Sequence, residues 1–187
     1  MKRWLAVLLA GVFLFAAAGC DGGGHAAVSS ADGAVDCAFE AQYIRVHDNQ
    51  GSSESPAVIR ISSQKELQDY KEIAGSRYDF GHAYSDSSKF SFNDAIKKYD
   101  DTFFEDRILA LIPVTEPSGS IRHKVTSVTT ENDTTTITVN RYSPGTGTCD
   151  MGYWHIFVEL RCGQAGSELK TEISEKTGTM EEYEASN

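Results

Sequence analysis

The alternation of apolar and polar positions predicts a series of short β-strands along much of the chain. Residues 39–46 and 57–61 are rich in aromatic and β-branched side chains, and residues 153–160 place apolar side chains at every second position, which is typical of strands with one buried face. Residues 108–114 are almost entirely apolar, which indicates a strand buried on both faces. We expect this last segment to be the central strand of a sheet.

A β-hairpin is predicted further along the chain. Residues 121–130 and 135–142 are rich in Thr and Val, and the polar segment 131–134 between them supplies turn residues. Val125 and Val128 lie on opposite parities of the first of these strands. This change of parity indicates a bulge or a local twist.

Two short helices are expected between the second and third strands. Ser63 and Glu66 have the spacing of a capping box, and Gly75 is suited to end the helix that follows. The apolar positions at helical spacing are Leu67, Tyr70, Ile73 and Ala74. Residues 93–99 form the second candidate helix. The pattern therefore predicts an α+β fold, a mostly antiparallel β-sheet with one or two short helices packed on one face.

The N-terminus has the pattern of a bacterial lipoprotein signal peptide. Lys2 and Arg3 precede a run of small and apolar residues over 4–18, which is shorter than the ~20 residues needed to span a bilayer as a helix. Residues 17–20, Ala-Ala-Gly-Cys, resemble a lipobox. We expect cleavage after residue 19, lipid of the diacylglyceryl and palmitate type on Cys20, and an extracytoplasmic protein anchored to the bacterial cell membrane.

Composition divides the rest of the chain into three parts. Residues 20–36 are small and polar, and a flexible tether of this length has a span of roughly 20–24 Å. Residues 37–162 carry the apolar patterns and form a single globular domain. Residues 163–187 are acidic and have little apolar periodicity, so we expect a disordered tail.

Charge limits the classes of partner. The chain has 17 basic and 27 acidic residues, a net charge of −10, and the signal peptide removes two of the basic ones. Such an acidic surface argues against binding of nucleic acid and against direct attraction to anionic lipid. The expected attachment to the membrane is therefore through lipid alone.

Three cysteines remain once Cys20 carries lipid, so at most one disulfide can form. Cys37 precedes the first strand and Cys162 follows the last, and antiparallel pairing of those strands brings the two together. Cys149 is a poorer partner for Cys162, because an extended strand separates them by roughly 26 Å. We expect a Cys37–Cys162 disulfide with Cys149 free. No zinc-ligand spacing is present, and no cofactor is expected.

Histidines and aromatic residues supply the candidate sites. His123 and His155 lie on predicted strands, where they are either partly exposed sheet residues or, if the strands are neighbours, a metal or acid–base pair. Tyr78, Phe80, Tyr84 and Phe90 lie in a long polar segment, where they either cover the core or form a recognition surface. No Gly-x-Ser-x-Gly motif frames a serine nucleophile.

Three segments together resemble the C-terminal domain of the protease complex subunit PrcB family of lipoproteins. They cover residues 99–111, 118–128 and 143–158, and they include Phe103-Phe104-Glu105, Ser118-Gly119, Ser143-Pro144-Gly145 and Trp154-His155-Ile156. The resemblance implies a small β-rich domain on an exported lipoprotein that assists a surface protease complex and has no catalysis of its own. Ser120-Ile121 and Tyr153-Trp154 depart from the family pattern.

These observations predict a lipid-anchored, extracytoplasmic accessory module that binds an unknown protein partner, with a surface protease or envelope complex as the candidate that it would assist. The alternative is a small secreted hydrolase that uses His123 or His155. The two differ in a structural consequence, because the hydrolase needs a histidine with an accessible acidic or nucleophilic neighbour.

Overall fold

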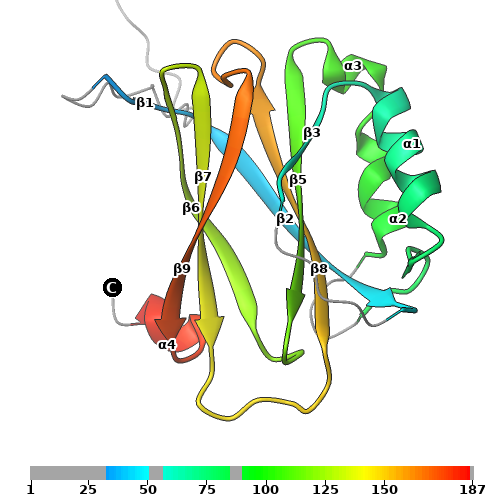
Figure 1. The fold of residues 1–187 in the computed structure, drawn as a ribbon, viewed down its shortest axis with the longest axis vertical. Coiled ribbons are helices and arrows are strands. Elements are labelled where there is room, and N and C mark those ends of the chain that lie inside the picture. Colours follow the sequence, from blue (N-terminus) through cyan, green and yellow to red (C-terminus); the bar gives the residue numbers. More distant parts are fainter. Residues whose placement is uncertain (1–32, 51–56, 85–89, 186–187) are drawn as a thin grey trace, which may run out of the picture.

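The computed structural model describes residues 33–50, 57–84 and 90–185 of the chain. Figure 1 shows three layers: a group of helices, a five-stranded sheet, and a four-stranded sheet on its other face. Strands dominate and, with one exception, neighbouring strands pair antiparallel. The predicted α+β class, mostly antiparallel β with short helices on one face, is confirmed.

The five-stranded sheet has the order β3-β5-β8-β2-β4. Its strands are β2 (Phe39–Asp48), β3 (Ile59–Ile61), β4 (Tyr78–Asp79), β5 (Arg107–Glu116) and β8 (Gly152–Arg161). β8 holds the middle position and is buried along its length except at Arg161. The strand expected to be central, β5, lies beside it, because β8 has long antiparallel partners on both sides and β5 has only the short β3 on its other side.

The four-stranded sheet has the order β1-β6-β7-β9. Its strands are β1 (Val35–Asp36), β6 (Arg122–Glu131), β7 (Thr134–Ser143) and β9 (Glu168–Thr177). β6 and β7 form the predicted hairpin, and their register shifts between Val125 and Ser127, which confirms the predicted irregularity. The turn is tight because Asn132 and Asp133 both have positive φ, at 47° and 65°, as a two-residue hairpin turn requires.

The expectation of a disordered tail after residue 162 is wrong for most of that segment. β9 pairs parallel with β7 over its full length, and Leu169 and Ile173 pack against the core between the sheets. A short helix, α4 (Met180–Ala185), follows. The charged residues of β9 conceal the strand because an edge strand needs only a few apolar side chains on its one inner face.

The helical layer contains α1 (Gln64–Ala74), α2 (Phe92–Ala95), the 3₁₀-helix η1 (Ile96–Lys98) and α3 (Asp101–Phe104). Ser63 caps α1 by accepting a hydrogen bond from the Glu66 N–H, as predicted. Leu67 is fully buried, whereas Ile73 is 76% exposed and does not belong to the core face. The single helix expected at 93–99 is divided between α2 and η1.

Two apolar cores separate the three layers. One lies between the helices and the five-stranded sheet and includes Leu67, Phe92, Leu111 and Phe157. The other lies between the sheets and includes Ile112, Ile137, Trp154 and Ile156. Along β8 the side chains alternate between the two cores, which explains why this strand is buried on both faces. Among the described residues, no helix is long and apolar enough to cross a membrane.

Candidate functional site

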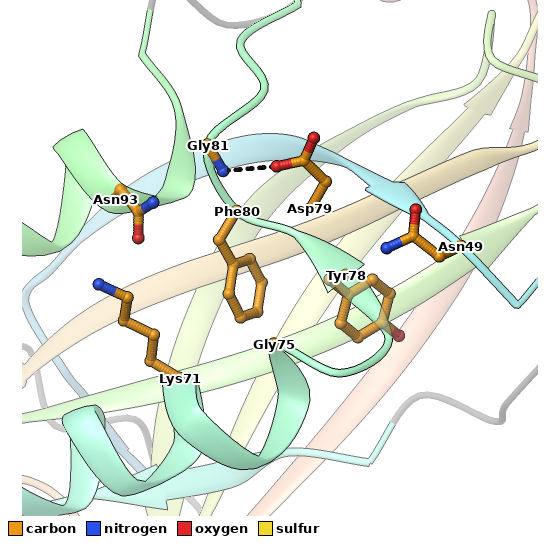
Figure 2. A pocket seen from close by; sticks show the side chains of 8 residues that line it. All are labelled: Asn49, Lys71, Gly75, Tyr78, Asp79, Phe80, Gly81 and Asn93. Atoms are coloured by element: carbon orange, nitrogen blue, oxygen red, sulfur yellow. Dashed lines mark hydrogen bonds between the residues drawn. The ribbon is translucent and has the colours of Figure 1, made fainter.

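An open pocket of about 510 Å³ lies where β2 ends, on the helical side of the five-stranded sheet. Figure 2 shows its wall, to which four separate segments contribute. The lining residues are Asn49, Lys71, Gly75, Tyr78, Asp79, Phe80, Gly81 and Asn93. Because its residues lie in or next to β2, α1, β4 and α2, which are separate in the sequence, the pocket is a product of tertiary structure.

A buried ion pair fixes the rim of the pocket. Arg77 Nε donates to Asp48 Oδ2 at 2.7 Å, with the Asp48 side chain fully buried and the Arg77 side chain 11% exposed. The Asn49 N–H donates to the Arg77 carbonyl at 2.9 Å. These contacts join the end of β2 to the turn between α1 and β4. Removing one member of such a buried pair would leave the other charge buried and unpaired, so the pair stabilises this junction.

Two polar groups of residues that line the pocket have no protein partner, one of them charged and the other a buried atom. Among the described residues, the Lys71 ammonium makes no hydrogen bond or ion pair, and the buried Asn93 Oδ1 accepts no hydrogen bond. Asp79 differs, because its Oδ1 accepts from the Gly81 N–H at 2.9 Å. In Figure 2 Lys71 and Asn93 lie to one side of Phe80, and Asp79 lies to the other. The pocket therefore has a cation at one end and a carboxylate at the other, and the Asn93 oxygen is shielded from solvent.

Aromatic side chains packed around His155 form the floor of the pocket. The His155 ring meets the rings of Tyr78 and Phe80 edge-on, at centroid distances of 4.9 and 5.5 Å. Its Nε2 is 2.6 Å from the Tyr70 hydroxyl, while its Nδ1 has no hydrogen-bond partner among the described residues. Burial, with a smaller contribution from Arg77, lowers the pKa of His155 from 6.5 to about 3. His155 is therefore neutral and lies beneath the pocket rather than in it.

The four aromatic residues singled out as a possible interaction surface divide between two roles. Tyr78 and Phe80 are 7% and 5% exposed and belong to the core. Most of their side-chain surface therefore packs inside the protein and is not available as the expected interaction surface. The small remainder contributes to the pocket. Tyr84 is half-buried, with the Arg45 guanidinium 4.4 Å from its ring centroid. Phe90 is 58% exposed. Tyr78 and Phe80 are buried because β4 pairs with β2 at the edge of the five-stranded sheet, which places this segment over the core.

His123 and His155 do not meet. His123 lies on β6 in the four-stranded sheet, against Trp154, whereas His155 points from β8 toward the helices. The His123 side chain is fully buried, and its Nε2 lies 2.7 Å from Glu116 Oε1. Neither ring is accessible to a substrate in this structure. The structure therefore does not bring the two histidines together as a metal or acid–base pair, and each ring is buried.

Glu116 anchors a charged row between the two sheets. It receives hydrogen bonds from His123 and, at two oxygens, from Arg141, which also pairs with Glu175 on β9. Burial by itself would raise the pKa of Glu116, but hydrogen bonds from His123 and Arg141 outweigh it, so that the pKa falls below its usual value. Because every member of the row has a partner, its role is to hold the two sheets together.

The two turns that carry part of the family resemblance lie side by side. The Gly119 N–H donates to the Asp150 carbonyl at 2.8 Å, and Ser118 Oγ donates to the Thr148 carbonyl at 2.9 Å. Arg45 from β2 completes the junction with a 2.6 Å ion pair to Asp150. A Cβ at Gly119 would lie only 2.3 Å from Arg45 Nη2. The junction is thus closed by its own contacts and leaves no space for a ligand.

The expected Cys37–Cys162 disulfide is not formed in the structure. The strand pairing behind it is present, with Phe39 opposite Leu160. Before Phe39, however, the chain turns to the other sheet: the Cys37 N–H donates to the Val128 carbonyl, and its thiol lies 3.3 Å from Thr130 Oγ1. All three described cysteines are free thiols, with Cys37 buried and Cys149 and Cys162 exposed.

No group of three or more His, Cys, Asp or Glu side chains within residues 33–50, 57–84 and 90–185 is arranged to hold a metal ion. The predicted lipid site, Cys20, lies outside the described residues, as do the signal peptide and most of the tether.

Comparison with known proteins adds no relative. No family model matches the chain, and no curated protein or solved structure with which it was compared is similar to it.

Sequence patterns did not find the pocket. Lys71, Asp79 and Asn93 carry no motif, and their segments come together only through the pairing of β4 with β2 and the packing of α1 beside α2. The one available signal was the aromatic pair Tyr78 and Phe80. The sequence singled them out as a candidate recognition surface, and in the structure their segment lines the pocket.

Proposed function

We propose that the protein is a lipid-anchored, extracytoplasmic accessory module that binds a protein partner through the pocket at the end of β2. The pocket carries the proposal. It is open, the buried Asp48–Arg77 ion pair joins two segments of its rim, and the Lys71 ammonium that lines it makes no hydrogen bond or ion pair among the described residues. A concave site with a charged group that has no protein partner is suited to orienting a ligand.

Two features of the sequence support the location and the class. The run over residues 4–18 followed by Ala-Ala-Gly-Cys is typical of a lipoprotein signal. The resemblance to the PrcB family favours an accessory role at a surface protease or envelope complex. The acidic surface disfavours nucleic acid. We propose no catalytic role, because the two histidines that suggested one are buried and apart.

A paired substitution tests the proposal in cross-linked membranes. A Cβ at Gly81 meets only ordinary contacts, so the indole of Gly81→Trp can occupy the pocket, whereas a Cβ at Gly163 meets nothing within 4 Å. The full chain and Gly163→Trp should recover the same envelope protein after cross-linking, and Gly81→Trp should lose it. Equal recovery by both variants, or recovery of the chain alone from the unchanged protein, would contradict the proposal.

A further inference from the structure

We infer that the edge strand β9 is a self-association surface, on which two copies of the chain pair antiparallel about a two-fold axis through Thr171. The inference goes beyond the proposed function and does not depend on the pocket, which lies on the helical side of the other sheet. It rests on three properties of β9: an unpaired backbone edge, two partly buried apolar side chains, and a charge pattern that complements itself in one register.

One side of the β9 backbone has no partner. β9 is last in the order β1-β6-β7-β9, next to β7. The N–H groups of Glu168 and Gly178 donate to the carbonyls of Asp133 and Ser143, on the β7 side, and the register between them is unbroken. Backbone groups alternate in direction along a strand, so the odd-numbered residues, such as Thr171, face outward. Among the described residues, these outward groups make no hydrogen bond.

This edge lacks most of the features that prevent strand pairing. A long, flat edge is a template for another strand, and proteins blunt such edges with proline, bulges or charged side chains. β9 has ten residues, contains neither proline nor glycine, and keeps one register with β7 throughout. Only its charged side chains remain as protection, and their order decides which strands they exclude.

The charges of β9 attract a second copy of the same strand. Opposite residues of an antiparallel pair lie on the same face, and an axis through Thr171 sets Lys170 opposite the partner's Glu172 on both sides of the axis. Because the Thr171 backbone faces outward, this is a non-hydrogen-bonded position, where opposite side chains are closest. Lys170 is 58% exposed and lies 3.7 Å from Glu168 of its own strand, and the exposed Glu172 has no ion pair among the described residues. Both side chains are therefore accessible to a second chain.

The same register joins apolar side chains of the two copies. Leu169 and Ile173 pack against the core between the sheets and are only partly buried. With the axis at Thr171, Leu169 lies opposite the partner's Ile173, so each covers surface that the other leaves exposed. The outward N–H and C=O groups of these three residues pair across the axis. Backbone, apolar and charged groups are thus satisfied together.

Neighbouring registers are disfavoured by the same side chains. An axis through Glu172 places this carboxylate opposite itself, and an axis through Lys170 does the same with its ammonium. An axis through Ile173 sets Lys170 opposite the partner's Lys176. Like charges directly opposite destabilise a strand pair. Pairing about Thr171 also ends before the chain reaches α4, which lies at the arrowhead end of β9 in Figure 1.

Charge reversal at the two facing positions tests the inference. Donor-tagged and acceptor-tagged copies of the full chain are diluted in a large excess of detergent micelles, and energy transfer between them gives the dissociation constant. Lys170→Glu and Glu172→Lys should each weaken self-association about ten-fold or more, because two attractive pairs become repulsive. An equal mixture of the two variants should regain the affinity of the unchanged chain, since opposite charges face each other again. Recovery in the mixture also shows that both variants are folded.

A matched control separates the register from general charge. Lys65→Glu makes the same change of charge as Lys170→Glu, at an 81% exposed side chain on α1, and should leave the dissociation constant unchanged. An equal loss in these two variants would show repulsion between acidic chains only and would reject the assignment. No concentration-dependent transfer between unchanged copies, undiminished affinity in both β9 variants, or a mixture as weak as its components would each overturn the inference.

Disulfide trapping tests the register independently. A Lys170→Cys copy is mixed with a Glu172→Cys copy, both carrying serine in place of the exposed Cys149 and Cys162, and copper phenanthroline takes up the two electrons released. The facing Cα atoms lie ~4.5 Å apart, which is within the range of a disulfide. We expect several-fold more disulfide-linked dimer from the mixture than from either copy alone. Equal yields would contradict the pairing of positions 170 and 172.

Ser174→Cys in the same background distinguishes the one remaining register. An axis through Ser174 keeps opposite charges together, but it sets Ile173 opposite the partner's Glu175. With the axis at Thr171 the two copies of position 174 are ~20 Å apart, so Ser174→Cys should not cross-link. A linked Ser174→Cys dimer in place of the mixed dimer would move the axis to Ser174 and reject the pairing about Thr171.

Discussion

One buried side chain, His155, makes the stability of this fold depend on pH. It lies among four aromatic rings, and its Nδ1 has no hydrogen-bond partner among the described residues. Burial and the nearby Arg77 lower its pKa to about 3. Unfolding returns the imidazole to its usual pKa of 6.5. The unfolded chain therefore binds one more proton than the native protein at any pH between these two values.

It follows that stability is lost as pH falls from 6.5 toward 3. The slope from this residue approaches ~1.4 kcal/mol per pH unit in that window. The double variant His155→Phe/Tyr70→Phe removes the imidazole together with its hydroxyl partner, so we expect a flatter curve of unfolding free energy against pH over the same range. Denaturant titrations at several pH values measure it. Parallel curves for the two proteins would show that other groups cause the acid sensitivity.

At the scale of elements, the hairpin turn between β6 and β7 depends on two residues with positive φ. Asn132 and Asp133 occupy this left-handed region at 47° and 65°, which costs a β-branched residue about 1–2 kcal/mol. Asn132→Val should therefore lower the free energy of unfolding by roughly that amount, while Asn132→Gly should leave it unchanged or raise it. Denaturant unfolding measures both. An equal loss in the two variants would point to the Asn132 side chain rather than to its backbone.

β9 supports the four-stranded sheet, contrary to the expectation from its charged sequence. Ile173 packs between the sheets, whereas its neighbour Glu172 points to solvent. Ile173→Ala should cost about 1–2 kcal/mol, less than for a fully buried isoleucine, and Glu172→Ala should stay within ~0.5 kcal/mol. Thermal melts of the two variants give the comparison. Indistinguishable melting temperatures would mean that β9 contributes little to the folded state.

Local patterns found most strands because each has a regular alternation or an unbroken apolar run. The bulge in β6 was also predictable, since Val125 and Val128 can share a face only if the register slips between them. β9 was missed because only Leu169 and Ile173 mark its inner face. The central place of β8 depends on which strands pair across the chain, and alternation within one strand carries no such information.

The pocket could not be predicted for the same physical reason. Tyr78 and Phe80 stood out by composition, but whether an aromatic residue covers a core or faces a partner is decided by tertiary packing. Lys71 and Asn93 look like ordinary surface residues in the sequence. Their lack of partners is visible only when the side chains around them are in place.

At the scale of the whole molecule, we predict that membrane attachment depends on Cys20. Mass spectrometry of the membrane fraction should find a diacylglyceryl-modified peptide that begins at this residue, because the run over residues 4–18 leads directly to it. Cys20→Ala should release the protein or leave its signal peptide attached. Unchanged membrane retention with a cleaved, unmodified N-terminus would contradict this prediction.

β2 connects the two parts of the molecule that the proposed function requires, the expected tether and the pocket. The chain enters it at Phe39, soon after the expected tether, and leaves it at Asp48, next to the pocket residue Asn49. Its ten residues span about 33 Å, so the pocket lies at the end of the domain away from the tether. In Figure 1 the strand runs diagonally across the sheet from β1 toward the end of the helical layer.

This arrangement gives β2 a mechanical consequence. If the proposed function is right, a partner that is held in the pocket and moves away from the lipid anchor pulls on β2 from both ends, since the tether precedes Phe39 and the pocket residue Asn49 follows Asp48. The hydrogen bonds that join β2 to β8, from Phe39 opposite Leu160 to Val46 opposite Tyr153, lie across that direction. They share the load in shear instead of opening one after another, so the proposed function predicts that the domain transmits tension between membrane and partner while its sheet stays intact.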